Sequence, residues 1–204
     1  MVIINLNSIP VFKESTNFCL EKKELDTLMN LKYKVSEMGS SLSIDSFILK
    51  NNIFKRIKKF LNEKVSFYKE KILEINNNIY LTQSWATICK KTKGHHNHIH
   101  PNTFLSAIFY VKSKDNFLQF NLARSPLAQG FNFEYDVKKF NTYNGENWRL
   151  PVNTGDVVIF PGWLNHGSIN SSCTEKILIG SNYFIKGEFG DKNNLNYDYL
   201  KIWK

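Results

Sequence analysis

The sequence is poor in the residue types that build most redox and metal sites. Its 204 residues include only 5 histidines and 3 cysteines. The cysteines, Cys19, Cys89 and Cys173, are odd in number and far apart. They match neither a disulfide framework nor the paired spacing of a structural zinc site. We therefore expect reduced thiols in an intracellular protein.

Long apolar runs are missing as well. No stretch of the sequence approaches the ~20 apolar residues that a helix needs to cross a bilayer. Residues 1–15 have neither the basic lead nor the small-residue cleavage site of a signal peptide. We therefore expect a cytoplasmic protein without a membrane partner. The hydrophobic share of 42% and the aromatic share of 14% fit one folded domain over residues 1–204.

Negative charge is also scarce, because 18 acidic residues face 27 basic ones and leave a formal charge of +9. Such an excess is typical of chains that bind nucleic acid. The basic residues are almost all lysines spread along the chain, whereas bidentate readers of phosphate and guanine are usually arginines. The only arginines are Arg56, Arg124 and Arg149. Nucleic acid is thus a conceivable partner but not the favoured one.

The first third of the chain carries helical patterns. One apolar face recurs at mixed spacings of three and four, through Phe54, Ile57, Leu61, Val65, Tyr68 and Ile72. This predicts a helix over residues 54–72 whose lysines cover the solvent side. A second helix is expected over residues 17–37. Residues 1–78 are therefore interpreted as mainly helical support.

After Asn78 the chain becomes rich in aromatic and β-branched residues separated by turn signals. Strands are expected over residues 79–90, 103–112, 116–123, 156–161 and 175–186. Residues 151–156, PVNTGD, predict a tight turn. Helices followed by many strands indicate an α+β domain with two layers of sheet and the helices packed on one outer face. Residues 79–186 would form the core and 187–204 a tail.

Four of the five histidines lie within residues 95–100, HHNHIH. In a strand, residues two apart point to the same side, so His98 and His100 would converge, His96 could join them and His95 would face away. Pro101 would end strand pairing there. A His-x-His pair with one remote histidine suits a divalent metal such as Fe, Zn, Cu or Ni.

The remote partner is His166, within residues 155–170, GDVVIFPGWLNHGSIN. A turn at Gly155, a buried strand and a second turn after Pro161 would present this histidine at the mouth of the sheets. A plain hairpin into the core and an inert surface patch of histidines are the simpler interpretations. Neither explains why the two histidine segments share almost all of this residue type, so we favour a metal site.

These segments resemble a known family. HNHIHPNTFLSAIFYV, GDVVIFPGWLNHGSIN and EKILIGSNYF look like the iron(II)- and 2-oxoglutarate-dependent dioxygenase superfamily. The likeness is to a branch seen in phages and bacteria with His-x-His-Pro and Phe-Pro-x-Trp-Leu-x-His motifs, and it covers about residues 80–186. It implies a double-stranded β-helix, or jelly roll, which in a phage-encoded chain would work in the host cytoplasm.

The resemblance also implies a ligand set and cofactors, Fe(II) and 2-oxoglutarate. The family holds iron through a His-x-Asp/Glu pair and a distal histidine, and here His100 occupies the carboxylate position. Either His98, His100 and His166 form a three-histidine triad, or one of the pair supports the site from behind. A remote carboxylate such as Asp115 is a further candidate, and His95 and His96 remain outer candidates.

Other site residues follow from the same resemblance. Family members bind the far carboxylate of 2-oxoglutarate with a basic residue about ten positions after the distal histidine, which here is Lys176. Weaker candidates for cofactor binding are Tyr110, Asn182, Arg124, Asn102 and Ser106. Trp85 and Trp163 are interpreted as packing residues.

The implied activity is hydroxylation of an unactivated carbon with O2, releasing succinate and CO2. The substrate, a small molecule or a peptide, is not identified by the sequence, nor is the oligomeric state. Three alternatives stay open. They are a cupin-type three-histidine enzyme without 2-oxoglutarate, a non-enzymatic jelly-roll binding or structural protein, and an oxygenase that modifies nucleic acid.

Overall fold

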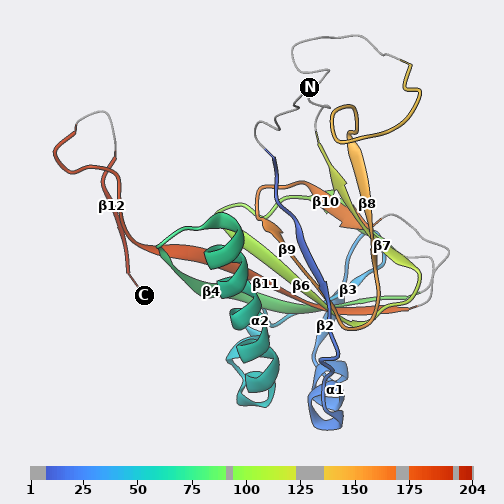
Figure 1. The fold of residues 1–204 in the computed structure, drawn as a ribbon. Helices are drawn as coiled ribbons and strands as arrows, with labels where there is room; N and C mark the ends of the chain where they lie inside the picture. The colour runs from blue at the N-terminus through green and yellow to red at the C-terminus, as the bar shows by residue number, and fades with distance from the viewer. Residues whose placement is uncertain (1–7, 91–93, 123–135, 169–174, 195–197, 204) are drawn as a thin grey trace.

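The computed structural model describes residues 8–90, 94–122, 136–168, 175–194 and 198–203. Within these residues the strands form two sheets, and Figure 1 shows the smaller one standing beside the larger. The larger sheet has the order β1-β9-β6-β11-β4-β3-β2, and β12 pairs with the end of β11. The smaller sheet has the order β5-β10-β7-β8. Neighbouring strands in both sheets are antiparallel.

The strands of the larger sheet, in its order, are β1 (Phe12–Ser15), β9 (Asp156–Pro161), β6 (Leu105–Lys112), β11 (Lys176–Phe189), β4 (Asn78–Cys89), β3 (Ser41–Ser43) and β2 (Tyr33–Val35), with β12 (Leu200–Ile202) outside that order. The strands of the smaller sheet are β5 (His95–His98), β10 (His166–Ser168), β7 (Asn116–Asn121) and β8 (Asn147–Val152).

Strand alternation divides the interior into two apolar clusters. On β6, Leu105, Ala107 and Phe109 point to one side, while Ile108 and Tyr110 point to the other. The first side packs with helix residues such as Ile57 and Leu61. The second side packs with residues of the smaller sheet, among them Leu118, Phe120 and Val152. The larger sheet therefore lies between the helical layer and the smaller sheet, and any site between the two sheets faces the second cluster.

The helices come from the first third of the chain, as Figure 1 shows in blue and teal. They are α1 (Lys22–Met29) and α2 (Lys55–Phe67), with a π-helical turn (Tyr68–Leu73) after α2 and short 3-10 turns at Ile48–Lys50 and Asn52–Phe54. The helix expected over 54–72 is confirmed. The helix expected over 17–37 is too long, because α1 ends at Met29 and β2 begins at Tyr33.

Five strands expected from the sequence are present as β4, β6, β7, β9 and β11. The turn at residues 153–155 is present too, with Gly155 at a φ of 86° that favours glycine. It does not close a hairpin, because β8 pairs with β7 while β9 pairs with β1 and β6. The turn instead moves the chain from the smaller sheet to the larger one, which brings the segment leading to His166 between the layers.

None of the helices in the described ranges combines the length and the apolar character that crossing a membrane requires.

Candidate metal centre

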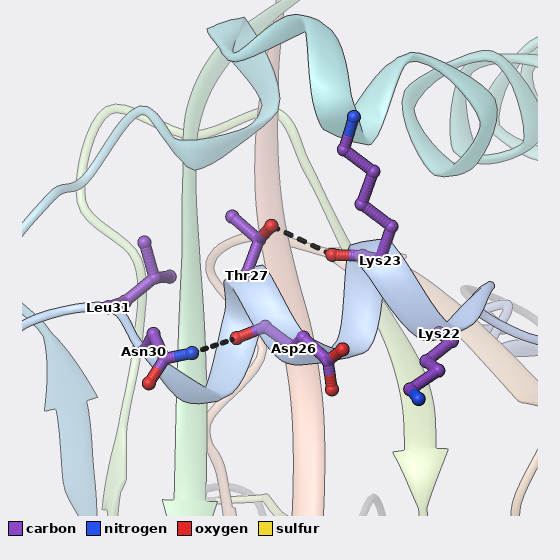
Figure 2. Close-up of a pocket in the computed structure, with 6 residues that line it drawn as sticks. All are labelled: Lys22, Lys23, Asp26, Thr27, Asn30 and Leu31. Carbon is purple, nitrogen blue, oxygen red and sulfur yellow. Dashed lines mark hydrogen bonds between the residues drawn. The ribbon is translucent and has the colours of Figure 1, made fainter.

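Two hollows of the protein differ in the side chains that line them. A surface hollow along α1 is lined by Lys22, Lys23, Asp26, Thr27, Asn30 and Leu31. Figure 2 shows that the Thr27 hydroxyl and the Asn30 amide donate to carbonyls of their own helix, at Lys23 and Asp26. Hydrogen bonds of this kind stabilise the helix, and they do not bring catalytic side chains together. The cavity between the two sheets, in contrast, collects four of the five histidines.

Three of these histidines converge on one point. His98 ends β5, His166 begins β10, and the two residues are direct partners across the strand pair. His100 follows β5, where its backbone N–H donates to the Gly162 carbonyl at 2.8 Å. One ring nitrogen from each histidine lies within 4.8 Å of the others, and among the described residues this group contains no carboxylate. The geometry therefore brings together the two histidine segments as the sequence predicted.

Hydrogen bonds fix the proton of each ring on Nδ1. The Nδ1 atoms of His98 and His166 lie 2.8 Å from the carbonyl oxygens of His96 and Leu164, which can only accept. Nδ1 of His100 lies 2.7 Å from the amide oxygen of Asn182, another acceptor. All three rings must therefore donate from Nδ1, and each keeps a lone pair on Nε2.

This arrangement fits a bound cation. The Nε2 atoms of His98 and His100 lie 3.0 Å apart, so two lone pairs face each other at a distance where they repel. A divalent ion between them would turn this repulsion into coordination, and neutral imidazole nitrogen is a good ligand for iron or zinc. Carbonyl and amide partners behind ligating histidines are what metal sites generally use to orient their rings.

The electrostatics keep the rings neutral. Burial, with a smaller contribution from the neighbouring histidines, lowers the pKa of His166 to about 3 and that of His100 to about 4. Burial also lowers the pKa of His98. A protonated imidazole cannot bind a metal, so these shifts leave the three Nε2 atoms available for coordination well below neutral pH.

The cavity extends from the three histidines to a buried lysine. Lys176 is only 5% exposed and lines the same cavity, together with Tyr110, Cys89 and Thr87. Burial raises the pKa of the Tyr110 hydroxyl and of the Cys89 thiol, and Lys176 partly offsets the shift of the thiol. Lys176 brings a cationic side chain to the far end of the cavity, which suits a carboxylate.

The expected orientation of His95 and His96 is wrong. The register moves from His166↔His98 to Ser168↔His95, so three steps on β5 oppose two on β10. This bulge inserts one residue and reverses the alternation beyond it. His95 consequently lines the cavity, while His96 is exposed. Gly167 on β10 leaves room for the bulge, because a Cβ there would lie 2.4 Å from Asn97 Oδ1 and 3.0 Å from the His95 carbonyl.

The comparisons with known proteins bear on this site. The family model described as "Putative 2OG-Fe(II) oxygenase" matches residues 83–181, which include all three converging histidines and Lys176. Residues 83–181 are thus similar to the 2OG-Fe(II) oxygenase family. The resemblance stated from the motifs is thereby confirmed for this family. No curated protein matches the chain.

Solved structures of 2OG-Fe(II) oxygenases share the fold at low identity. A Pseudomonas putida prolyl-4-hydroxylase is 10% identical with a TM-score of 0.59, covering 88% of this chain and 95% of its own. A Trichoplax adhaerens prolyl hydroxylase bound to a hypoxia inducible factor peptide fragment is 9% identical with a TM-score of 0.60, covering 87% and 84%. HygX from Streptomyces hygroscopicus, with nickel, 2-oxoglutarate and hygromycin B bound, is 12% identical with a TM-score of 0.58, covering 86% and 82%. They support the jelly-roll fold.

The other residues predicted for this oxygenase site fall into different places. Ser106 and Asn182 lie behind His100, because the Ser106 hydroxyl is 2.7 Å from its Nδ1 and 3.0 Å from the Asn182 amide oxygen. Asn102 is exposed at a φ of 56° and is not among the cavity-lining residues. Asp115 is exposed at the turn between β6 and β7, outside the histidine group. Arg124 lies outside the described residues.

Trp85 packs beside the oxygenase site rather than far from it. Its ring meets that of His100 edge to face, with centroids 5.4 Å apart. Gly180 makes room for the indole, since a Cβ there would lie 2.5 Å from it. Trp163 is 56% exposed, so its interpretation as a packing residue does not hold in the isolated chain.

Proposed function

We propose that the chain is an Fe(II)- and 2-oxoglutarate-dependent oxygenase whose iron is held by His98, His100 and His166. The observation that carries this proposal is the set of three Nε2 lone pairs, each fixed by an acceptor behind its ring. In this chain a neutral imidazole takes the position where the family places a carboxylate. Bound iron would thus keep one more unit of positive charge than it does with a His-x-Asp/Glu pair.

Iron supplies the chemistry that the side chains lack: activation of O2 coupled to decarboxylation of 2-oxoglutarate, with succinate and CO2 released and a carbon hydroxylated. The chain's own residues orient the partners. Lys176 would pair with the far carboxylate of 2-oxoglutarate, and the Tyr110 hydroxyl would donate to the same molecule. Both residues line the cavity at its buried end. The apolar walls from Ile108, Leu118 and Leu178 would limit the access of water.

The substrate class is open between a small molecule and a peptide. HygX was solved with hygromycin B, and the Trichoplax enzyme with a peptide fragment. We propose these two classes as the first to test, for hydroxylation of an unactivated carbon. Nucleic acid is a weaker candidate because the excess positive charge is carried by dispersed lysines.

The test uses protein purified without a polyhistidine tag. We expect wild-type protein to bind one equivalent of iron(II) and to form succinate from 2-oxoglutarate in air, even without a substrate, at a slow uncoupled rate. His166→Ala should lose metal and succinate together, because it removes one ligand of three. His96→Ala is the matched control: an exposed histidine of the same segment, whose loss should leave both unchanged. Full turnover in His166→Ala would refute the ligand assignment.

A cupin-type metal enzyme without 2-oxoglutarate is the second candidate, and the absence of a carboxylate from the histidine group of the described residues favours it. It predicts bound metal, O2 consumption with some substrate, and no succinate. A non-enzymatic jelly roll predicts no metal at all. The same two assays, metal content and succinate, therefore separate the three functions.

A further inference from the structure

We propose that His95 is a further ligand-binding residue, which together with Lys176 holds a carboxylate group of the cosubstrate. The inference rests on the proposed function and assigns a role to the histidine that the bulge in β5 turns inward. His95 and Lys176 line the same cavity as the three converging histidines. His96, its neighbour in sequence, is exposed.

His95 is placed to touch the contents of the cavity rather than the metal. Its ring lies edge to face with that of His98, with centroids 4.7 Å apart. Its nitrogens nevertheless fall outside the group of ring atoms that lie within 4.8 Å of one another. A ligand that reaches from the metal toward Lys176 would pass along this ring.

A tether on the other side of the ring orients it. Nδ1 of His95 lies 3.1 Å from the hydroxyl oxygen of Ser40, which lies 2.7 Å from that of Ser36. Ser40 is fully buried. The Ser40 contact uses Nδ1, so Nε2 is the ring atom left to bond a ligand.

The sheet register brings this tether to the lysine end of the cavity. Ser41 on β3 pairs with Ile88 on β4, and the next residue of β4, Cys89, pairs with Lys176 on β11. Ser40 therefore enters β3 beside Cys89, one strand away from Lys176. His95, held by Ser40, lies between that end of the cavity and His98.

The chemistry of this end suits an anion. The described lining residues include Lys176 and no aspartate or glutamate. When Ser36 donates to Ser40 and Ser40 donates to Nδ1, the ring proton resides on Nε2 and can be donated to a carboxylate oxygen. A hydrogen bond to a charged group contributes more than one between neutral groups. The ammonium of Lys176 is a compact charge that does not fix the orientation of a carboxylate by itself. A second donor from His95 would help to orient it.

The experiment measures the dissociation constant of 2-oxoglutarate for zinc-loaded protein by calorimetry, so that no turnover is required. His95→Leu should weaken binding roughly tenfold to a hundredfold, because it removes a hydrogen bond to a charged ligand. A glutamine amide reaches the position of Nε2 and an asparagine amide that of Nδ1. His95→Gln should therefore recover most of the affinity, whereas His95→Asn should resemble His95→Leu.

His96→Leu is the matched control and should bind as the wild type does, and zinc content should stay at one equivalent in all variants. Wild-type affinity in His95→Leu would overturn the proposal. So would wild-type affinity in His95→Asn, because the Ser40 tether alone would then explain the residue. If the zinc-loaded wild type bound no 2-oxoglutarate, the proposed function itself would fail. If the wild type bound 2-oxoglutarate and His95→Leu bound it equally well, only the role of His95 would fail and the proposed function would stand.

Discussion

The acceptor behind each histidine decides what the ring can do. His98 and His166 donate to backbone carbonyls, which no point substitution removes. His100 instead depends on side chains, because its Nδ1 lies 2.7 Å from both the amide oxygen of Asn182 and the hydroxyl of Ser106. Asn182 accepts from this ring, and the Ser106 hydroxyl donates to Asn182. A mutation at Asn182 can therefore change the orientation or tautomer of a proposed ligand without altering the ligand itself.

We predict that Asn182→Ala weakens zinc binding about 10- to 100-fold, the usual effect of losing a partner behind a metal-ligating histidine. Asn182→Asp should restore the affinity, because a carboxylate accepts the Nδ1 proton at least as well. Competition with a chromophoric chelator measures both. Asn62→Ala, at an exposed position on α2, is the control. Equal weakening by Ala and Asp would show that packing, not the acceptor, is what matters.

For single residues, the sequence predicts which histidines cluster better than it predicts the side to which each side chain points. His98, His100 and His166 could be chosen because a histidine-poor chain concentrates the residue in two segments. The inward turn of His95 was not predictable, since a one-residue bulge depends on the partner strand. Ser106 and Asn182 were expected at the cofactor, and their sequence position could not reveal that they contact Nδ1 of His100.

Among the elements, strands with continuous apolar and β-branched sequences were predictable, and polar ones were not. Residues on both faces are buried in β4, β6, β9 and β11, so the apolar composition of these strands predicts them. β5 reads HHNH and β10 reads HGS, and these strands exist because they pair with each other. The helix expected over 17–37 ended early for the same reason: residues from Tyr33 onward gain more from pairing in β2 with β3 than from extending α1.

The contact of β1 with β9 rests on a buried carboxylate. Asp156 is 1% exposed, forms an ion pair with Lys13 at 3.0 Å and accepts the backbone N–H of Asn153 at 2.8 Å. Burial alone would raise its pKa. Hydrogen bonds from Ser15, Asn153 and Lys13, with the charge of Lys13, outweigh burial and lower the pKa below its usual 3.8.

We predict that Asp156→Asn lowers the free energy of unfolding by about 1–2 kcal/mol at pH 7. Because the folded-state pKa is depressed, the wild-type advantage is present above pH 3.8 and is lost as the pH falls below it. Urea unfolding at pH 7 and near pH 3 measures the two differences. Glu63→Gln, in an exposed pair with Lys59 at 3.8 Å, should change stability little at either pH. A difference that persisted undiminished at low pH would contradict the linkage.

For the whole molecule, the proposed metal is a link between the layers. His98 and His166 belong to the smaller sheet, while His100 is bonded through Asn182 to the larger sheet. The two sheets otherwise meet through the apolar cluster of Ile108, Phe120 and Phe160 with its neighbours. A metal bound by all three histidines would therefore stabilise the folded chain as a unit and not one strand pair.

We predict that zinc at about 100 times its dissociation constant adds about 2.7 kcal/mol to the free energy of unfolding, which raises the Tm of a chain of this size by roughly 5–10 °C. Scanning calorimetry with metal and with chelator measures the shift. His96→Ala should keep the full shift, because its exposed ring contributes no ligand. His166→Ala should lose most of it, since the ligand that it removes is the buried one from β10. A shift of undiminished size in His166→Ala would mean that the ion binds elsewhere, and the link between the sheets would have to be abandoned.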